Sequence, residues 1–427
     1  MKKAKILSKT GSEVTIEIKL QITNSILESE ELLQESLNQA GILGSELILA
    51  SFDTDGAPIM IGETKLTSKG KEEKIYQCPY GEVNVSRHVY QSSSGGKTYC
   101  PLEYNAKIIM TATPKYSKMI SSKYSMVGAT SVAEDFQSNH ARSISSSYVK
   151  NISDMVGAVA LIKEDSWSYE VPELENISTI SIGLDGTCML MKDDGWREAM
   201  TGSIAFHDKD GNRKSTIYTA ARPEYGKDTF LNKFSNIISR VKDKYKNVNY
   251  LGVADGAKSN WSFLKNHTEH QILDFYHVSE YVGSVGSSLY NKKNENNQRE
   301  EWIKEKLHTL KNTSKGASTL LREFKTLQEE DNNNKKTQEE LSKTISYFTN
   351  NKDKMKYSYY VDNNWPIGSG VTEAACKIIV KERLCGSGMR WTNEGASVVL
   401  KLRCLTKSEN QWNLFWKRID RYGLNLG

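Results

Sequence analysis

The chain has little that would mark a membrane protein or a disulfide-stabilised protein. In 427 residues no apolar run approaches the roughly 18–20 residues that a membrane helix needs, so we expect no membrane partner. The six cysteines form no Cys-x-x-Cys pair, and a chain of this length does not depend on disulfide bonds, so we expect reduced thiols in a cytosol. The basic start, Met1–Lys5, leads into a Ser/Thr/Glu-rich stretch instead of an apolar segment, so we expect no signal peptide.

Net charge is also small, but it is unevenly placed. There are 57 Lys and Arg against 52 Asp and Glu, which gives +5. The 55 residues from Glu373 to Gly427 hold ten basic and five acidic residues, a surplus of five. A nucleic acid or another polyanion is therefore a natural partner for that end of the chain.

Hydrophobic periodicity divides the chain into regions of different type. A strand at Val14–Leu20 and a helix at Ser29–Asn38 are predicted near the start. Proline is absent between Pro223 and Pro366, which suits a helical segment. The expected regions are a β-rich part (1–112), a helical part (113–170), an α/β domain with the order β-β-β-α-β-α-β (175–277, completed by 357–390), a helical insertion (278–356) and C-terminal helices (391–427).

The helical part contains a helix-turn-helix pattern. Apolar stripes at helical spacing flank a polar turn that holds Ile144 and Ser145, and Ser145 is a good N-cap for the second helix. That helix would expose side chains able to contact phosphates or base edges, namely Ser146, Ser147, Lys150 and Asn151. A plain helical linker with a solvated polar face fits the same pattern.

Two Asp-Gly pairs stand in or directly after predicted strands of the α/β domain. Asp185 is out of phase with the apolar residues of its strand, and Asp255 follows the last residue of another strand. The adjacent glycines let a ligand or a backbone come close, and strand ends of α/β sheets are where ligands bind. Asp-Gly is also an ordinary turn signal, so two turns remain the simpler interpretation of these pairs alone.

A third acid, Glu373, follows the glycine-rich block Pro366–Gly370 in the first turn of a predicted helix. Lys377 and Lys381 follow at spacings of four, on the same helix face. An acid in the first turn also favours the helix dipole, and Glu–Lys pairs four apart are common on surfaces. This helix by itself therefore assigns Glu373 no function.

Taken in order, these motifs resemble the DDE transposases of bacterial insertion sequences, and most of all the ISKra family. The resemblance covers roughly residues 175–420, and the glycine-rich block and the Gly-Ser-Gly-Met-Arg-Trp block are its specific parts. The N-terminal third matches loosely and lacks the cysteine pairs of some relatives. The blocks that carry the resemblance are Gly183–Thr187, Val253–Ala257, Asp274–His277, Pro366–Lys377 and Gly386–Trp391.

By that resemblance, Asp185, Asp255 and Glu373 are the acidic triad of a ribonuclease H-like domain of the retroviral integrase type. Glu373 follows Asp255 by 118 positions, and this interval would hold an all-helical insertion. The resemblance implies a transposase that binds the terminal inverted repeats of its element, cuts the DNA ends and joins the 3′-OH to target DNA. It also implies a homodimer or larger assembly on DNA, in a bacterial cytoplasm at the nucleoid.

The chemistry of that reaction explains the residue types. Hydrolysis and strand transfer need an activated oxygen nucleophile and a stabilised leaving oxygen, which two Mg²⁺ ions about 3.5–4 Å apart supply. Mg²⁺ prefers oxygen ligands and keeps several waters, and Mn²⁺ takes the same ligands, so a few carboxylates suffice. We expect Asp185 to bridge both ions, and Asp255 and Glu373 to hold one each.

Asp274 and His277 form an Asp-x-x-His pair like one that some transposases carry beside the triad. In that role they are accessory catalytic residues, and His277 would orient a phosphate or a carboxylate. A histidine at a strand end fits the pattern equally well.

The basic C-terminal surplus provides candidates for DNA contact. Arg390 and Trp391 suit a phosphate contact and a base stack, and Lys377, Lys381 and Arg383 suit a basic track. The same track would continue through Lys401, Arg403, Lys417 and Arg418. Solvated helix faces would give the same pattern.

Two other classes of function stay open. A ribonuclease H-like nuclease or resolvase would use the same metal site without strand transfer, although the helix-turn-helix and the insertion argue against it. A domesticated, non-catalytic DNA-binding protein would be favoured by the loss of one acid, and all three acids are present.

Overall fold

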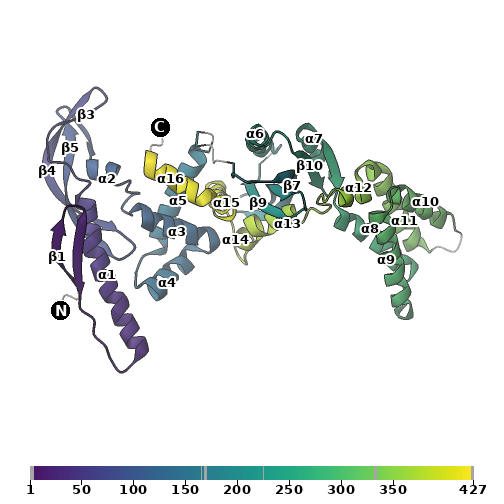
Figure 1. The fold of residues 1–427 in the computed structure, drawn as a ribbon, viewed down its shortest axis with the longest axis horizontal. Coiled ribbons are helices and arrows are strands. Elements are labelled where there is room, and N and C mark those ends of the chain that lie inside the picture. The colour runs from purple at the N-terminus through teal and green to yellow at the C-terminus, as the bar shows by residue number, and fades with distance from the viewer. Residues whose placement is uncertain (1–3, 165, 168–170, 225, 331–333, 425–427) are drawn as a thin grey trace. The chain divides into compact units, whose positions relative to one another are not determined.

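The computed structural model describes residues 4–164, 166–167, 171–224, 226–330 and 334–424 (Figure 1). The chain divides into two compact units, of which the first is Met1–Glu170 with Ser397–Thr406 and Asn410–Gly427, and the second is Val171–Ala396 with Lys407–Glu409. Within the described ranges, no helix is both long and apolar enough to cross a membrane.

The first unit begins with an antiparallel ribbon and a long helix. The ribbon pairs β1 (Ala4–Thr10) with β2 (Glu13–Ile18), and the helix is α1 (Ile26–Ala50). The expected strand is confirmed, but the helix is far longer than the predicted stretch. Two glycines disfavour helix in its second half, and Gly41 is accommodated because the Tyr80 ring packs where a Cβ would lie, at 2.2 Å.

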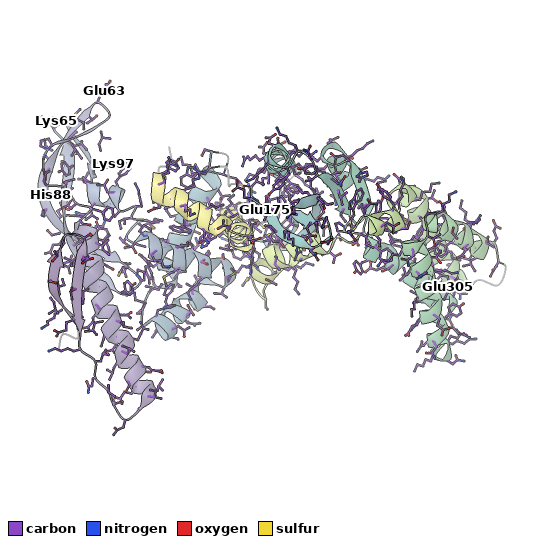
Figure 2. All side chains as sticks on the ribbon, in the orientation of Figure 1. Glu63, Lys65, His88, Lys97, Glu175 and Glu305 are labelled. Carbon is purple, nitrogen blue, oxygen red and sulfur yellow. The ribbon has the colours of Figure 1, made fainter. Side chains whose placement is uncertain are left out.

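A four-stranded antiparallel sheet follows, in the order β3-β4-β5-β6. Its strands are β3 (Ile59–Ile61), β4 (Thr64–Gln77), β5 (Glu82–Ser92) and β6 (Gly95–Tyr99), and α2 (Pro101–Asn105) comes next. Its buried side chains form a core with Leu49 of α1 and Leu102 of α2. His88 of β5 lies 3.0 Å from Asp53 through Nδ1, and charged side chains such as Lys65 project from the strands (Figure 2). This sheet lies in the part of the chain that the sequence predicted to be β-rich.

Three helices complete the N-terminal part of this unit, namely α3 (Pro114–Met126), α4 (Ala129–His140) and α5 (Ser146–Ile162). The Ser145 hydroxyl accepts the backbone N–H of Tyr148, which confirms the predicted N-cap of α5. The polar residues predicted to face outward are exposed, and Lys150 pairs with Asp154. The apolar stripe is buried: Val149, Ile152, Val156 and Val159.

The second unit is built on a five-stranded mixed sheet in the order β11-β10-β7-β8-β9. β7, β8 and β9 are antiparallel neighbours, whereas β10 and β11 run parallel to β7. The strands are β7 (Ile177–Met191), β8 (Gly195–Asp208), β9 (Arg213–Ala221), β10 (Asn249–Ala254) and β11 (His270–Leu273). The mixed α/β class and the predicted order of elements are confirmed.

Two helices connect the parallel strands, α6 (Asp228–Lys244) before β10 and α7 (Lys258–His267) after it. The apolar side of α6, led by Phe230 and Phe234, packs with Ile180 and Ile182 of β7 in one buried core. The sheet is thereby held rigid beside the strand ends that carry the candidate acids.

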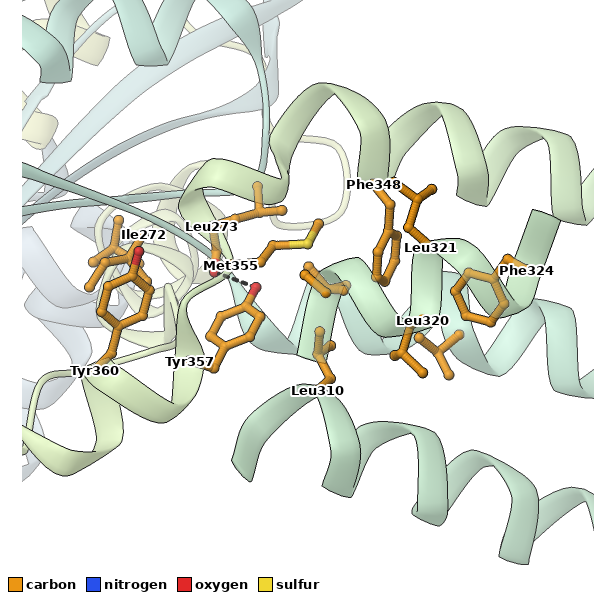
Figure 3. Close-up of a cluster of buried hydrophobic side chains, with 14 of the residues drawn as sticks. Ile272, Leu273, Leu310, Leu320, Leu321, Phe324, Phe348, Met355, Tyr357 and Tyr360 are labelled. Atoms are coloured by element: carbon orange, nitrogen blue, oxygen red, sulfur yellow. Dashed lines mark hydrogen bonds between the residues drawn. The ribbon is translucent and has the colours of Figure 1, made fainter. Parts of the chain in front are cut away.

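A helical segment follows β11, as the sequence predicted. Its helices are α8 (Phe275–Leu289), α9 (Asn296–Asn312), α10 (Gly316–Glu329), α11 (Lys335–Asn351) and α12 (Tyr357–Asp362). Leu320, Phe324 and Phe348 form part of a core that continues to the end of the sheet (Figure 3). There the Tyr357 hydroxyl donates to the carbonyl of Leu273 at 2.9 Å (Figure 3), so the insertion and β11 share one apolar core.

The chain then forms α13 (Gly370–Ala375), a π-helical turn (Cys376–Lys381) and α14 (Glu382–Leu384). The last helices are α15 (Asn393–Lys407) and α16 (Gln411–Tyr422). π-Helical turns are rare and often occur at functional sites.

Candidate active site

Three aspartates lie just beyond the last residues that β7, β10 and β11 pair in parallel. Gly252 of β10 lies opposite Ile182 of β7, so Asp255 and Asp185, three residues further on, are level with each other. Ala254 lies opposite Leu273 of β11, so Asp274 continues the row. Neighbouring strands lie about 4.8 Å apart, so the row brings three carboxylates to one edge of the sheet.

Asp185 lies inside β7, opposite Thr201, so its Asp-Gly pair is not a turn. Burial raises the pKa of Asp185, and the charges of Asp255 and Glu198 raise it further. The Gly186 N–H at 2.7 Å and the Cys376 thiol at 3.5 Å act in the opposite direction. A bound cation would relieve the same electrostatic cost, because it favours the charged carboxylate.

Asp255 occupies a sharp bend that the insertion supports. The next residue, Gly256, has φ +116°, which a side chain would strain. The Tyr347 hydroxyl of α11 donates to the Asp255 carbonyl at 2.7 Å, and the carboxylate accepts the N–H of Ala257 at 3.2 Å. The backbone at Asp255 is therefore held by a residue 92 positions further along the chain.

The helix that carries Glu373 lies directly against the strand that carries Asp185. A Cβ on Gly183 would come within 2.0 Å of the Thr372 hydroxyl, which itself lies 2.9 Å from that of Ser203. Cys376 touches Asp185 from the same helical segment. The pattern of apolar residues alone would bury Val371, Ala374 and Ile378. The buried residues are instead Thr372, Ala375, Cys376, Ile379 and Val380, because the helix turns its short polar side chains toward β7.

Glu373 itself is exposed and is held by a serine that the sequence analysis did not single out. The Ser369 hydroxyl lies 2.9 Å from Oε1 of Glu373 and 2.6 Å from Oδ2 of Asp274. Asp274 is 1% exposed and caps α8 by accepting the N–H of Tyr276. The structure thus links Glu373 to Asp274, and the register places Asp274 beside Asp255.

The glycine-rich block explains how that link is built. The Phe275 N–H donates to the Ile367 carbonyl at 2.8 Å, which fixes the block onto the start of α8. Gly368 has the Tyr276 ring 2.9 Å from where its Cβ would be, so only glycine fits without a shift. A serine inside a glycine-rich block just before an acid was the available signal for Ser369.

His277 lies in the first turn of α8 and not on a strand, because β11 ends at Leu273 and Asp274 starts the helix. Its Nδ1 lies 3.1 Å from Glu280. Its ring stands edge-on to those of Tyr281 and Tyr347. These contacts direct His277 toward the insertion helices.

The basic residues divide into exposed and buried ones. Lys377, Lys381 and Arg390 are exposed, as predicted. Arg383 is 4% exposed with its guanidinium 5.2 Å from the centre of the Trp391 ring. Trp391 donates its indole N–H to the Leu384 carbonyl at 2.8 Å. Arg383 and Trp391 therefore stabilise the segment that follows the helix of Glu373, although both were predicted to contact DNA.

Two residues of the expected continuation of the basic track, Lys401 and Arg403, are buried, whereas Lys417 is exposed. Lys401 is buried and pairs with Glu164 at 2.7 Å. Arg403 is 1% exposed and donates to the Ser125 carbonyl at 2.7 Å. Both side chains stabilise the interior of the first unit.

The donors at the sheet edge are carboxylate oxygens, the type that Mg²⁺ prefers. Asp185 and Asp255 lie on adjacent strands, while the carboxylate of Glu373 is hydrogen-bonded to Ser369. Across the part of the chain that the structure describes, no three His, Cys, Asp or Glu side chains are already gathered as a metal-binding group. The residue types fit Mg²⁺, and a shared site requires movement of these carboxylates.

A cavity of about 570 Å³ adjoins Asp255 and was not predicted. It lies among α7, α8 and α11, with Gly256 and Tyr347 in its wall. Among the described residues that line it there are three lysines, Lys258, Lys343 and Lys354, and no acid. Lys343 and Lys354 pair with neighbouring acids, so the charge of the cavity is moderately positive.

No family model matches the chain, and no curated protein matches it. The solved Drosophila P element transposase strand transfer complex is similar to it at 9% identity, over 73% of this chain and 81% of that chain, with a TM-score of 0.28. A likeness this weak carries no argument, so the function must be argued from the residues of the chain.

Proposed function

We propose that the protein is a DDE transposase that binds the terminal inverted repeats of its element, cuts the DNA ends and joins the 3′-OH to target DNA. The observation that carries the proposal is the placement of three acids: Asp185 and Asp255 level on adjacent parallel strands, and Glu373 on a helix packed against the first of them. The sheet order, with three antiparallel strands and two parallel ones, supports a ribonuclease H-like domain, and the motif order supports the ISKra family.

In this proposal Asp185, Asp255 and Glu373 hold two Mg²⁺ ions, or Mn²⁺ in their place. When bound, the ions activate the attacking oxygen and stabilise the leaving one. Burial of Asp185 makes its charge costly without a cation, which favours metal binding there. Lys377 and Lys381, exposed on the helix of Glu373, bind the DNA backbone beside the site.

DNA recognition is proposed for α5, which exposes Ser146, Ser147 and Asn151. Lys150 forms an ion pair with Asp154, so it would contribute less to phosphate binding. Assembly on DNA as a homodimer or larger complex, in the cytoplasm of a bacterium, belongs to the same proposal.

The test is cleavage and joining of end-sequence DNA in Mg²⁺ or Mn²⁺. Asp185→Ala, Asp255→Ala and Glu373→Ala should each abolish both steps, because each removes a metal ligand and no core contact. Glu394→Ala removes an exposed acid of α15 and is the matched control. Near-normal cleavage by any of the three variants would refute its assignment, and cleavage by the wild type without joining would indicate a nuclease or resolvase.

A further inference from the structure

The row of aspartates ends at Asp274, which the mechanism above does not use as a metal ligand. Its carboxylate is almost fully buried, and the contacts it makes are with the Tyr276 N–H and the Ser369 hydroxyl. A buried carboxylate needs such donors, because an unsatisfied buried charge is costly. Asp274 therefore holds the Ser369 hydroxyl in a fixed place.

Ser369 in turn lies against the third acid of the proposed triad. Its Oγ is 2.9 Å from Oε1 of Glu373, whose side chain is otherwise exposed. An exposed glutamate has many rotamers, and fixing it for metal binding costs conformational entropy. A hydrogen-bonding contact that already restricts the carboxylate reduces that cost.

We propose that Asp274 and Ser369 are positioning residues that hold the Glu373 carboxylate near the row of strand ends, and that neither is a metal ligand. This inference rests on the proposed function, since it assigns Glu373 to a metal site. It replaces the direct catalytic role expected for Asp274 and adds Ser369, which no motif assigned. The insertion-side contacts of His277 leave that residue outside the arrangement.

The Ser369 hydroxyl is shared by two carboxylates, and this limits how firmly it holds Glu373. A serine has a single proton to donate, so Asp274 and Glu373 compete for it. Asp274 has the shorter contact and the deeper burial, so it keeps Ser369 in place while Glu373 exchanges this contact for a cation. Glu373 is thus restricted without being locked.

The experiment is calorimetric titration of the full-length protein with Mn²⁺, without DNA. Ser369→Ala and Asp274→Ala should each weaken Mn²⁺ binding by roughly 10-fold, as loss of a residue that orients a ligand typically does. Ser369→Thr keeps the hydroxyl and should stay within about 3-fold of the wild type. Asp274→Asn keeps only one of the two oxygens that accept from Ser369 and from the Tyr276 N–H, so its loss should lie between the wild type and Asp274→Ala. Ser288→Ala, which removes a buried serine hydroxyl from α8, is the matched control and should change nothing.

The decisive comparison uses the Glu373→Ala background. There Ser369→Ala should cause no further loss, because the residue acts through Glu373. An additive loss, or unchanged binding in Ser369→Ala, refutes the positioning role, and a loss in Asp274→Asn as large as in Asp185→Ala would make Asp274 a ligand instead. If Asp185→Ala, Asp255→Ala and Glu373→Ala all bind Mn²⁺ as the wild type does, the proposed metal site itself fails. Thermal melting of each variant separates these outcomes from misfolding.

Discussion

The basic residues just after Glu373 and those of α15 look alike in the sequence and differ in the structure. Lys377 and Lys381 are exposed along the helix of Glu373. Lys401 is 8% exposed and forms an ion pair with Glu164. Arg403 is 1% exposed and donates a hydrogen bond to the Ser125 carbonyl. A surplus of charge therefore counts side chains without saying which of them face a partner outside the protein.

The acids divide in the same way. Asp274 is buried and satisfied by Ser369 and a backbone N–H, whereas Glu373 is exposed and can exchange its contact. A buried charge must be balanced by partners around it, whereas an exposed charge can exchange its partners. Substitutions on the two sides of this division should behave differently, as follows.

The largest expected effect on stability is at the buried arginine. Arg403→Ala should lower the free energy of unfolding by about 2–4 kcal/mol, because it leaves a cavity and an unsatisfied Ser125 carbonyl. Urea unfolding followed by circular dichroism measures the loss. Lys381→Ala, on the exposed side of the division, should stay within about 0.5 kcal/mol. Equal losses in the two variants would remove the distinction.

Next is the contact that brings the helix of Glu373 to β7. Gly183→Ala should cost about 1–3 kcal/mol and reduce DNA cleavage, because the new methyl group would overlap the Thr372 hydroxyl. Gly283→Ala is the matched control, since it lies in α8 with nothing within 4 Å and should be neutral or stabilising by about 0.5–1 kcal/mol. Cleavage at the wild-type rate by Gly183→Ala would show that this packing does not position Glu373.

A smaller effect is expected at Asp185, a half-buried acid. The pKa of Asp185 is raised in the folded state, so its contribution is fully present below the usual pKa of aspartate and is lost as pH rises through the folded pKa. Asp185→Asn should therefore raise the thermal midpoint near pH 7 without metal, by roughly 2–4 °C for each 1 kcal/mol gained. The gain should vanish near pH 3, where both forms are neutral. Scanning calorimetry at the two pH values checks this, and an equal gain at both would rule out the charge as its cause.

The smallest effect on stability is expected at the exposed basic residues near Glu373. Their substitution tests whether exposed charges bind DNA. Replacing Lys377, Lys381 and Arg390 together by alanine should flatten the slope of log affinity for duplex DNA against log salt. The expected change is roughly 0.9 for each phosphate that the variant no longer neutralises. Folding should persist, because surface substitutions change stability by about 0.5 kcal/mol or less. A salt titration with an unchanged slope would mean that these side chains are merely solvated.

The sequence predicted most of the second unit because its elements are long and regularly patterned. The order of strands around β7, the helix α6 and the helical insertion follow from period-two and period-3.6 patterns. The level placement of Asp185 and Asp255 could not be predicted, because register between strands far apart in sequence depends on tertiary pairing.

Other features depend on contacts between distant residues. The length of α1 was missed because its two glycines disfavour helix, and the packing of Tyr80 on Gly41 is not visible in the sequence. The burial of Arg383 was missed because only the fold brings Trp391 back over it. Ser369 was overlooked because its role depends on Asp274, 95 positions away.

The helical segment separates Asp255 from Glu373 in the chain. The hydrogen bond from Tyr347 to the carbonyl of Asp255 connects this segment to the backbone of that acid. Without α11 the bend at Gly256 would lose this hydrogen bond, so we expect that the helical segment cannot be deleted without disturbing Asp255. We therefore expect the two parts to have been inherited together, with changes around Tyr347 compensated by changes beside Gly256.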